Sequence, residues 1–137
     1  MRYLSIDLGD KRTGVALGDE VTGIVTPHDV IVTASADERL RLLVKLVEAE
    51  APDALVVGLP LNMDDSEGPA AKKARAVGES IAQATGLTVH FADERQTSMD
   101  ADDQMAMSGL THKQKKARRD AMAAAVILRS YFENGPV

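Results

Sequence analysis

Short apolar runs rich in β-branched residues fill the first part of the chain and predict strands. Residues 3–8 are mostly apolar and end at a Gly-Asp turn signal, and residues 13–17 form a second β-prone run. A third strand is predicted over 21–32, with an interruption at Pro27. Because short turns connect these segments, we expect them to form an antiparallel meander.

In the rest of the chain, segments with apolar residues at helical spacing alternate with two further short apolar segments that predict strands. Ser35 followed by Glu38 is typical of a helix start, and Pro69 and Gly86 suit the first position and the end of another helix. This part of the chain is predicted to form helices at 35–47, 69–86, 99–107 and 113–132, and strands at 54–57 and 87–91. Helices that connect strands favour parallel pairing. The predicted fold class is therefore α/β, a mixed five-stranded sheet flanked by helices on both faces.

Composition fits a globular protein and excludes several kinds of chemistry. The chain has 137 residues, 45 % of them hydrophobic and 27 % charged, so we expect one domain over 1–137. The absence of cysteine excludes disulfides, Cys-ligated zinc, iron–sulfur clusters and thiol catalysis. Asp7 interrupts the N-terminal segment before a signal-peptide region could form, and no apolar run approaches the roughly 18 residues of a membrane span. We expect a cytoplasmic protein with no membrane partner.

The charge is distributed unevenly along the chain. Sixteen Lys and Arg against 21 Asp and Glu give a formal net charge of −5. Five positive charges nevertheless fall within seven residues, at Lys113, Lys115, Lys116, Arg118 and Arg119. An acidic protein with one basic stripe can still bind a polyanion locally.

Three carboxylates are candidates for a shared site. Asp7 ends a strand expected to be central, where it either caps the following turn or binds a partner or metal. Asp120 lies on the apolar stripe of its helix, which indicates either a salt bridge or a metal ligand. Glu94 follows the last predicted strand, with Asp93 as the alternative ligand at that strand end. Strand ends and the last helix can converge at one edge of the sheet.

Such a cluster would need positive charge to persist. At 4 Å and an effective dielectric constant of 20, each pair of carboxylates repels by about 4 kcal/mol. Oxygen-only ligands favour Mg²⁺ or Mn²⁺, and two such ions roughly 4 Å apart can promote phosphodiester hydrolysis. The carboxylates would then act as metal ligands rather than as acid–base catalysts.

The loop at 58–69 ends at a predicted helix N-terminus, which suits a phosphate, although a solvated surface loop fits its sequence equally well. The residues expected to contact nucleic acid are Lys11, Arg12, Asn62, Ser66, Arg95, Lys113 and Lys116.

Four motifs in a fixed order resemble one known family. They are DLGDKRTGVA from Asp7, VVGLPLNMD from Val56 with SEG at 66–68, DER from Asp93 and DAMAA from Asp120. The sequence is similar to the YqgF (RuvX) family of bacterial RNase H-like proteins, described as Holliday junction resolvases and as pre-16S rRNA nucleases. The resemblance implies an RNase H-like fold, a metal-binding triad of Asp7, Glu94 and Asp120, and maturation of the rRNA 5′ end in the cytoplasm. The chain departs from the usual family pattern at Asp65, Gln96 and Arg119.

The leading hypothesis is a Mg²⁺- or Mn²⁺-dependent nuclease that processes the 5′ end of precursor 16S rRNA. One alternative is a Holliday junction resolvase acting on branched DNA, and another is an rRNA-binding assembly factor that does not cleave. The first motif also resembles the phosphate-binding hairpin of actin-like ATPases and sugar kinases, which need a second lobe that 137 residues leave no room for. Both a monomer and a homodimer are compatible with the sequence.

Overall fold

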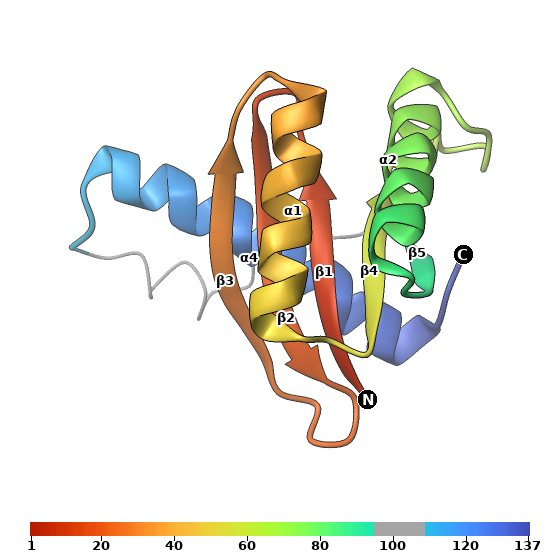
Figure 1. The fold of residues 1–137 in the computed structure, drawn as a ribbon, viewed down its shortest axis with the longest axis horizontal. Helices are drawn as coiled ribbons and strands as arrows, with labels where there is room; N and C mark the ends of the chain where they lie inside the picture. Colours follow the sequence, from red (N-terminus) through yellow and green to blue (C-terminus); the bar gives the residue numbers. More distant parts are fainter. Residues whose placement is uncertain (95–108) are drawn as a thin grey trace.

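The computed structural model describes residues 1–94 and 109–137, which form a five-stranded sheet packed between helices (Figure 1). The strand order is β3-β2-β1-β4-β5, so β1 is central. The strands are β1 (Arg2–Leu8), β2 (Arg12–Asp19), β3 (Val25–Val32), β4 (Ala54–Leu59) and β5 (Val89–Asp93).

Strand pairing follows the sequence prediction. β1 pairs antiparallel with β2, and β2 pairs antiparallel with β3, which confirms the meander. β4 lies parallel to β1 on the other side, and β5 lies parallel to β4. The C-terminal ends of β1, β4 and β5 therefore lie side by side at one end of the sheet, and the candidate carboxylates lie there.

Helices cover both faces of the sheet, as predicted for an α/β fold. α1 (Ala36–Glu50) and α2 (Pro69–Thr85) pack on one face, and α4 (His112–Asn134) crosses the other face (Figure 1). Ser35 caps α1 by accepting a hydrogen bond from the backbone N–H of Glu38. The short helix predicted at 99–107 lies outside the described residues.

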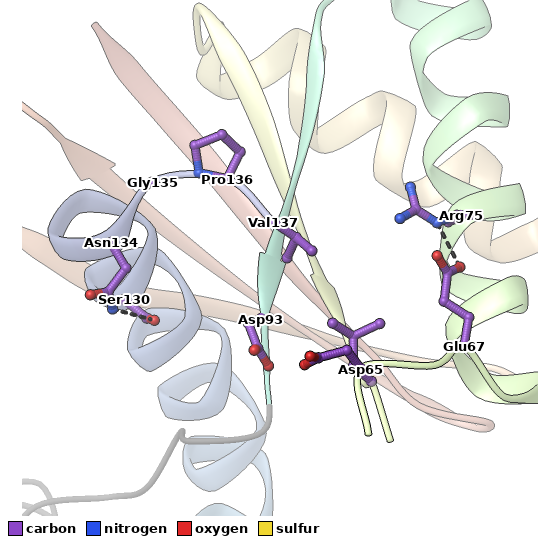
Figure 2. Close-up of a pocket in the computed structure, with 10 residues that line it drawn as sticks. Asp65, Glu67, Arg75, Asp93, Ser130, Asn134, Gly135, Pro136 and Val137 are labelled. Carbon is purple, nitrogen blue, oxygen red and sulfur yellow. Dashed lines mark hydrogen bonds and ion pairs between the residues drawn. The ribbon is translucent and has the colours of Figure 1, made fainter. Parts of the chain in front are cut away.

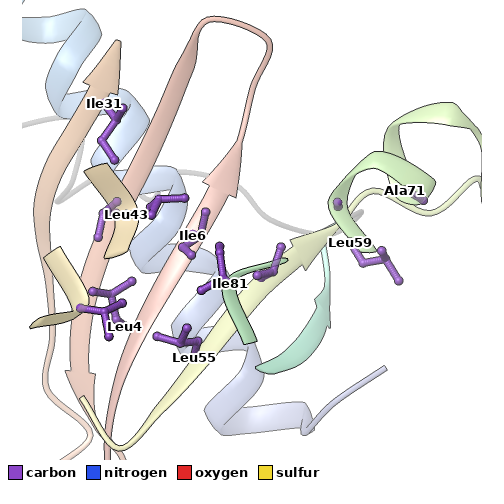
Figure 3. Close-up of a cluster of buried hydrophobic side chains, with 12 residues drawn as sticks. Leu4, Ile6, Ile31, Leu43, Leu55, Leu59, Ala71 and Ile81 are labelled. Atoms are coloured by element: carbon purple, nitrogen blue, oxygen red, sulfur yellow. The ribbon is translucent and has the colours of Figure 1, made fainter. Parts of the chain in front are cut away.

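A hydrophobic layer covers each face of the sheet. Leu4, Ile6 and Leu55 are fully buried and pack with side chains of α1 and α2, including Leu43 and Ile81 (Figure 3). Side chains alternate along a strand, so the odd-numbered residues of β1 point toward α4 instead. This alternation directs Asp7 to the α4 face.

The α4 face holds a smaller apolar layer and one buried polar contact. Tyr3, Val56, Ile127 and Leu128 form this layer. Ser5 is fully buried between them and donates a hydrogen bond of 2.7 Å to the backbone carbonyl of Ala124. The contact links α4 to the middle of β1.

The third strand differs from the prediction at its beginning. Pro27 lies inside β3 and does not interrupt it. Because β3 is an edge strand, a residue without an N–H is tolerated there, and the β2–β3 register shifts nearby between Val15 and Ala16. The prediction also started the strand too early, since β3 begins only at Val25. Within the described ranges, no helix has the length and apolar character needed to cross a membrane.

Candidate active site at the ends of the central strands

Asp7 and Glu94 come into contact at the C-terminal ends of β1 and β5, on either side of β4. Asp7 is the last-but-one residue of β1, and Glu94 directly follows β5. Gly58 of β4 lies between them, and a Cβ there would stand 3.2 Å from Glu94 Oε2 and 2.6 Å from Ile127 Cδ1. The missing side chain at Gly58 leaves the space in which Glu94 reaches Asp7.

Glu94 has a raised pKa in this position beside Asp7. Burial raises the pKa of Glu94 to about 9, and both a hydrogen bond with Asp7 and the negative charge of Asp7 act in the same direction. Glu94 therefore stays protonated at neutral pH and donates to the Asp7 carboxylate. Burial is the largest of these causes, so the site disfavours an ionised Glu94 mainly because water is excluded from it.

Asp120 approaches the same edge from α4. The helix backbone lies so close to β2 that a Cβ at Gly14 would overlap the carbonyl oxygen of Asp120. Gly14 is the pairing partner of Asp7 in the sheet, so this close approach brings α4 beside the end of β1. The carboxylate of Asp120 accepts a hydrogen bond from Nε of Arg12. The salt bridge that the sequence left as one alternative for Asp120 is thus present.

These residues border one open cavity of about 410 Å³. Asp7, Arg12 and Asp120 line it, together with Asp10 and Lys11 from the β1–β2 turn. In the described part of the chain, no three acidic or histidine side chains converge into a ready-made metal site. Asp7 and Glu94 are together, whereas the third predicted ligand, Asp120, is bound to Arg12. The oxygen donors suit a divalent cation, whereas Asp120 is already held by Arg12.

Asp93 points away from this cavity. Consecutive residues at a strand end face opposite sides, and Figure 2 shows the Asp93 side chain directed toward Asp65 of the loop after β4. It lines a separate cavity of about 400 Å³, to which Arg75 and Asn134 also contribute. Of the two candidates left open by the sequence, Glu94 is the one that lies beside Asp7.

The predicted phosphate-contacting residues surround the site at different distances. Lys11 is exposed on the turn beside Asp7, and Lys113 and Lys116 are exposed on the first turns of α4. These turns project past the β3 edge of the sheet (Figure 1). Arg95 lies outside the described residues.

Asn62 and Ser66 hold the β4–α2 loop together. The Asn62 side-chain amide donates to the Ser66 hydroxyl at 3.0 Å, and the Asn62 backbone N–H donates to the Ser66 carbonyl at 2.9 Å. The following helix begins after Gly68, where no side chain caps it, with Pro69 at its first position. The loop has a defined internal structure, and its contact with phosphate stays a prediction.

Sequence reasoning missed the two glycines that assemble the site. Gly14 admits the backbone of α4, and Gly58 admits Glu94. Gly14 stands inside a predicted strand and Gly58 directly follows one, and an isolated glycine in a strand indicates close approach of another group. That signal was available in the sequence, whereas the pairing of Arg12 with Asp120 joins residues 108 positions apart and had no local signal.

Relatives match this chain over nearly its whole length. The model of the family described as "RuvX: Holliday junction resolvase" matches residues 1–134. A relative from Anaeromyxobacter sp. strain Fw109-5 is 39 % identical over 133 residues, which is 97 % of each chain. A relative from Salmonella arizonae is 36 % identical over 132 residues, which is 96 % of each chain. Both carry the name "Putative pre-16S rRNA nuclease".

Two solved structures share the fold at low sequence identity. Thermus thermophilus RuvC in complex with a Holliday junction substrate matches with a TM-score of 0.63 and 17 % identity, over 98 % of this chain and 95 % of that one. Fowlpox virus resolvase in complex with Holliday junction DNA matches with a TM-score of 0.56 and 12 % identity, over 97 % of each chain. They identify the RNase H-like fold of RuvC-type resolvases. The family match over nearly the whole chain and the identity to its relatives confirm the resemblance: this chain belongs to the RuvX family, a nuclease family with the RNase H-like fold.

Proposed function

We propose that this protein is a divalent-metal-dependent nuclease that processes the 5′ end of precursor 16S rRNA in the cytoplasm. The observation that carries the proposal is the contact of Asp7 with Glu94 beside an open cavity that Asp120 also lines. Membership of a nuclease family and the names of the relatives support hydrolysis of a phosphodiester bond in rRNA.

Asp7, Glu94 and Asp120 would hold Mg²⁺ or Mn²⁺. Their fit rests on donor type, because Mg²⁺ and Mn²⁺ favour oxygen ligands, and on the contact of Asp7 with Glu94. Bound divalent cations supply activation of the attacking water and stabilisation of the leaving oxygen. The three side chains orient the cations and take no part as acids or bases.

The surroundings of the site suit a nucleic-acid backbone. The cavity is open to solvent, so a strand can pass across it. Lys11 stands at its border, and Lys113 and Lys116 extend the positive charge along α4. A polyanion would bind along this path through phosphate contacts, so its affinity should fall steeply with salt.

A Holliday junction resolvase is the second candidate. It is favoured by the description of the family and by the two structural relatives solved with junction DNA. The same carboxylates would serve either substrate. Fold and site geometry do not by themselves establish turnover, so an rRNA-binding assembly factor is a possible outcome of the test.

The test compares cleavage of an end-labelled 16S rRNA precursor fragment and a four-way DNA junction by the same preparations. Wild type, Asp7→Asn and Asp10→Asn are each assayed with Mg²⁺, Mn²⁺ or EDTA. Asp10 is the matched control, because it lines the same cavity while its carboxylate is 97 % exposed and pairs with Lys73 at 3.2 Å. We expect metal-dependent RNA cleavage that Asp7→Asn abolishes and Asp10→Asn retains.

The other outcomes separate the alternatives. Cleavage of the junction alone would make the protein a resolvase. Equal binding of RNA by wild type and Asp7→Asn, with no cleavage by either, would replace the nuclease proposal with the assembly-factor role.

A further inference from the structure

We propose that Arg12 holds Asp120 in the place of a divalent cation, and that cation binding transfers Arg12 to a phosphate of the nucleic acid. This inference rests on the proposed metal-dependent function. It makes Arg12 a positioning residue that couples the binding of metal to the binding of substrate.

The first support is the geometry of the ion pair. Arg12 begins β2 and Asp120 lies in α4, and their side chains are only 25 % and 29 % exposed. The backbone of Asp120 packs directly on Gly14, which leaves it no room to move toward the sheet. Only side-chain rotation can therefore change the partner of the Asp120 carboxylate.

The second support is the balance of charge at the cavity. Asp7, Asp10 and Asp120 all line this cavity, and Asp120 is the carboxylate that Arg12 neutralises. A divalent cation in this cavity would repel the Arg12 guanidinium, which lines the same cavity. Arg12 cannot be deprotonated to relieve this repulsion, so it has to move away.

The third support is what Arg12 would meet after moving. It lines the same open cavity as Asp7, where the substrate backbone is proposed to pass. A guanidinium forms charge-assisted hydrogen bonds with phosphate as well as it does with carboxylate. Arg12 therefore exchanges one anion for another, and each binding event favours the other.

A different role for Arg12 predicts the opposite result. A carboxylate has lone pairs for more than one partner, so Arg12 could stay on Asp120 and orient it as a metal ligand. Removal of the guanidinium would then weaken metal binding. Under the proposed exchange, its removal strengthens metal binding.

The experiment measures Mn²⁺ affinity by titration calorimetry and by electron paramagnetic resonance, without reference to cleavage. Wild type, Arg12→Gln and Lys11→Gln are titrated with and without a phosphorothioate RNA oligonucleotide, which resists hydrolysis. Lys11→Gln is the matched control, because it removes the same charge from the same cavity at a residue outside the Asp120 pair. Arg12→Lys is a second variant that keeps the charge, and thermal melting verifies that each variant is folded.

We expect Arg12→Gln to bind Mn²⁺ about tenfold more tightly than wild type without RNA, within the usual range of coupling between sites. Lys11→Gln should change the affinity much less, and Arg12→Lys should lie between wild type and Arg12→Gln. The oligonucleotide should tighten Mn²⁺ binding to wild type about fivefold or more and have little effect on Arg12→Gln.

Weaker Mn²⁺ binding by Arg12→Gln would overturn the exchange and assign Arg12 the orienting role. An equal gain in Lys11→Gln would also overturn it, because the effect would then be one of overall charge. If no form of the protein bound Mn²⁺, this inference and the proposed function would both fail. Coupled binding of Mn²⁺ and RNA without any cleavage in the assay of function would retire the nuclease proposal alone.

Discussion

Adding a single methyl group at Gly14 should reduce cleavage activity much more than it reduces the stability of the fold. Gly14 faces the backbone of α4 at Asp120 and pairs in the sheet with Asp7. In Gly14→Ala, the new Cβ would overlap the Asp120 carbonyl oxygen and stand 3.2 Å from the Ala121 nitrogen. Because both atoms belong to the helix backbone, no side-chain rotation relieves the overlap, and α4 itself has to move.

The magnitude follows from packing and from the geometry of the site. Overpacking of a buried contact costs about 1–3 kcal/mol, which corresponds to a fall in Tm of roughly 5–10 °C for a chain of this size. Displacement of a functional group by about 1 Å can reduce a rate by about 10²-fold. We therefore expect a folded variant whose cleavage is lowered far more than its stability.

Gly18→Ala provides the matched control on the same strand and the same face. Its Cβ would meet the side-chain atoms Leu128 Cδ2 at 2.8 Å and Val25 Cγ2 at 3.0 Å, and a backbone atom, Ile24 O, only at 3.2 Å. Both variants would be compared by thermal melting and by single-turnover cleavage. Wild-type cleavage by Gly14→Ala, or an equal loss in Gly18→Ala, would refute the reasoning that this contact places Asp120.

Three further predictions test the electrostatics and packing of the site. The raised pKa of Glu94 means that the metal-free fold loses stability as the pH rises from 4.5 toward 9. Glu94→Gln should therefore flatten this dependence and raise Tm at pH 8 by roughly 5 °C in thermal melts with EDTA, and an unchanged pH dependence would contradict the raised pKa. Replacing Lys113 and Lys116 together by Gln should weaken duplex binding and reduce the slope of log K against log salt by about 2, as measured by fluorescence anisotropy. Lys45→Gln, on the opposite face, serves as its control and should leave the slope unchanged. Ser5→Ala removes a buried hydrogen bond to α4 and should lower the free energy of unfolding by about 1 kcal/mol in urea titrations, whereas no loss would show that this bond does not fix the helix.

Local sequence signals were sufficient for most of the fold. The alternation of apolar residues, the cap at Ser35, the first-turn Pro69 and the terminal Gly86 predicted the elements because each reflects interactions within a few residues. The order of strands and helices then predicted the mixed sheet and its two covered faces. Pro27 was misinterpreted because only the sheet topology shows that its strand lies at an edge.

The candidate site was predicted as residues but not as an arrangement. Asp7, Glu94 and Asp120 were identifiable because carboxylates at a strand end or on an apolar helix face are costly and need a reason. The choice of Glu94 over Asp93 depended on which of the two side chains faces α4. The strand before them is too short for the sequence to show which of its residues point to which face of the sheet.

Tertiary structure decided how the charges are paired. The sequence alone determined the α/β class, the family motifs and the acidic residues of the site, because these are properties of residue type and spacing. Arg12 meets Asp120, and Glu94 meets Asp7, only because chain segments far apart in the sequence are brought together at one sheet edge. Gly14 and Gly58 permit these contacts because they have no side chain. Which groups fill the space beside each glycine depends on the neighbours that the tertiary structure places there.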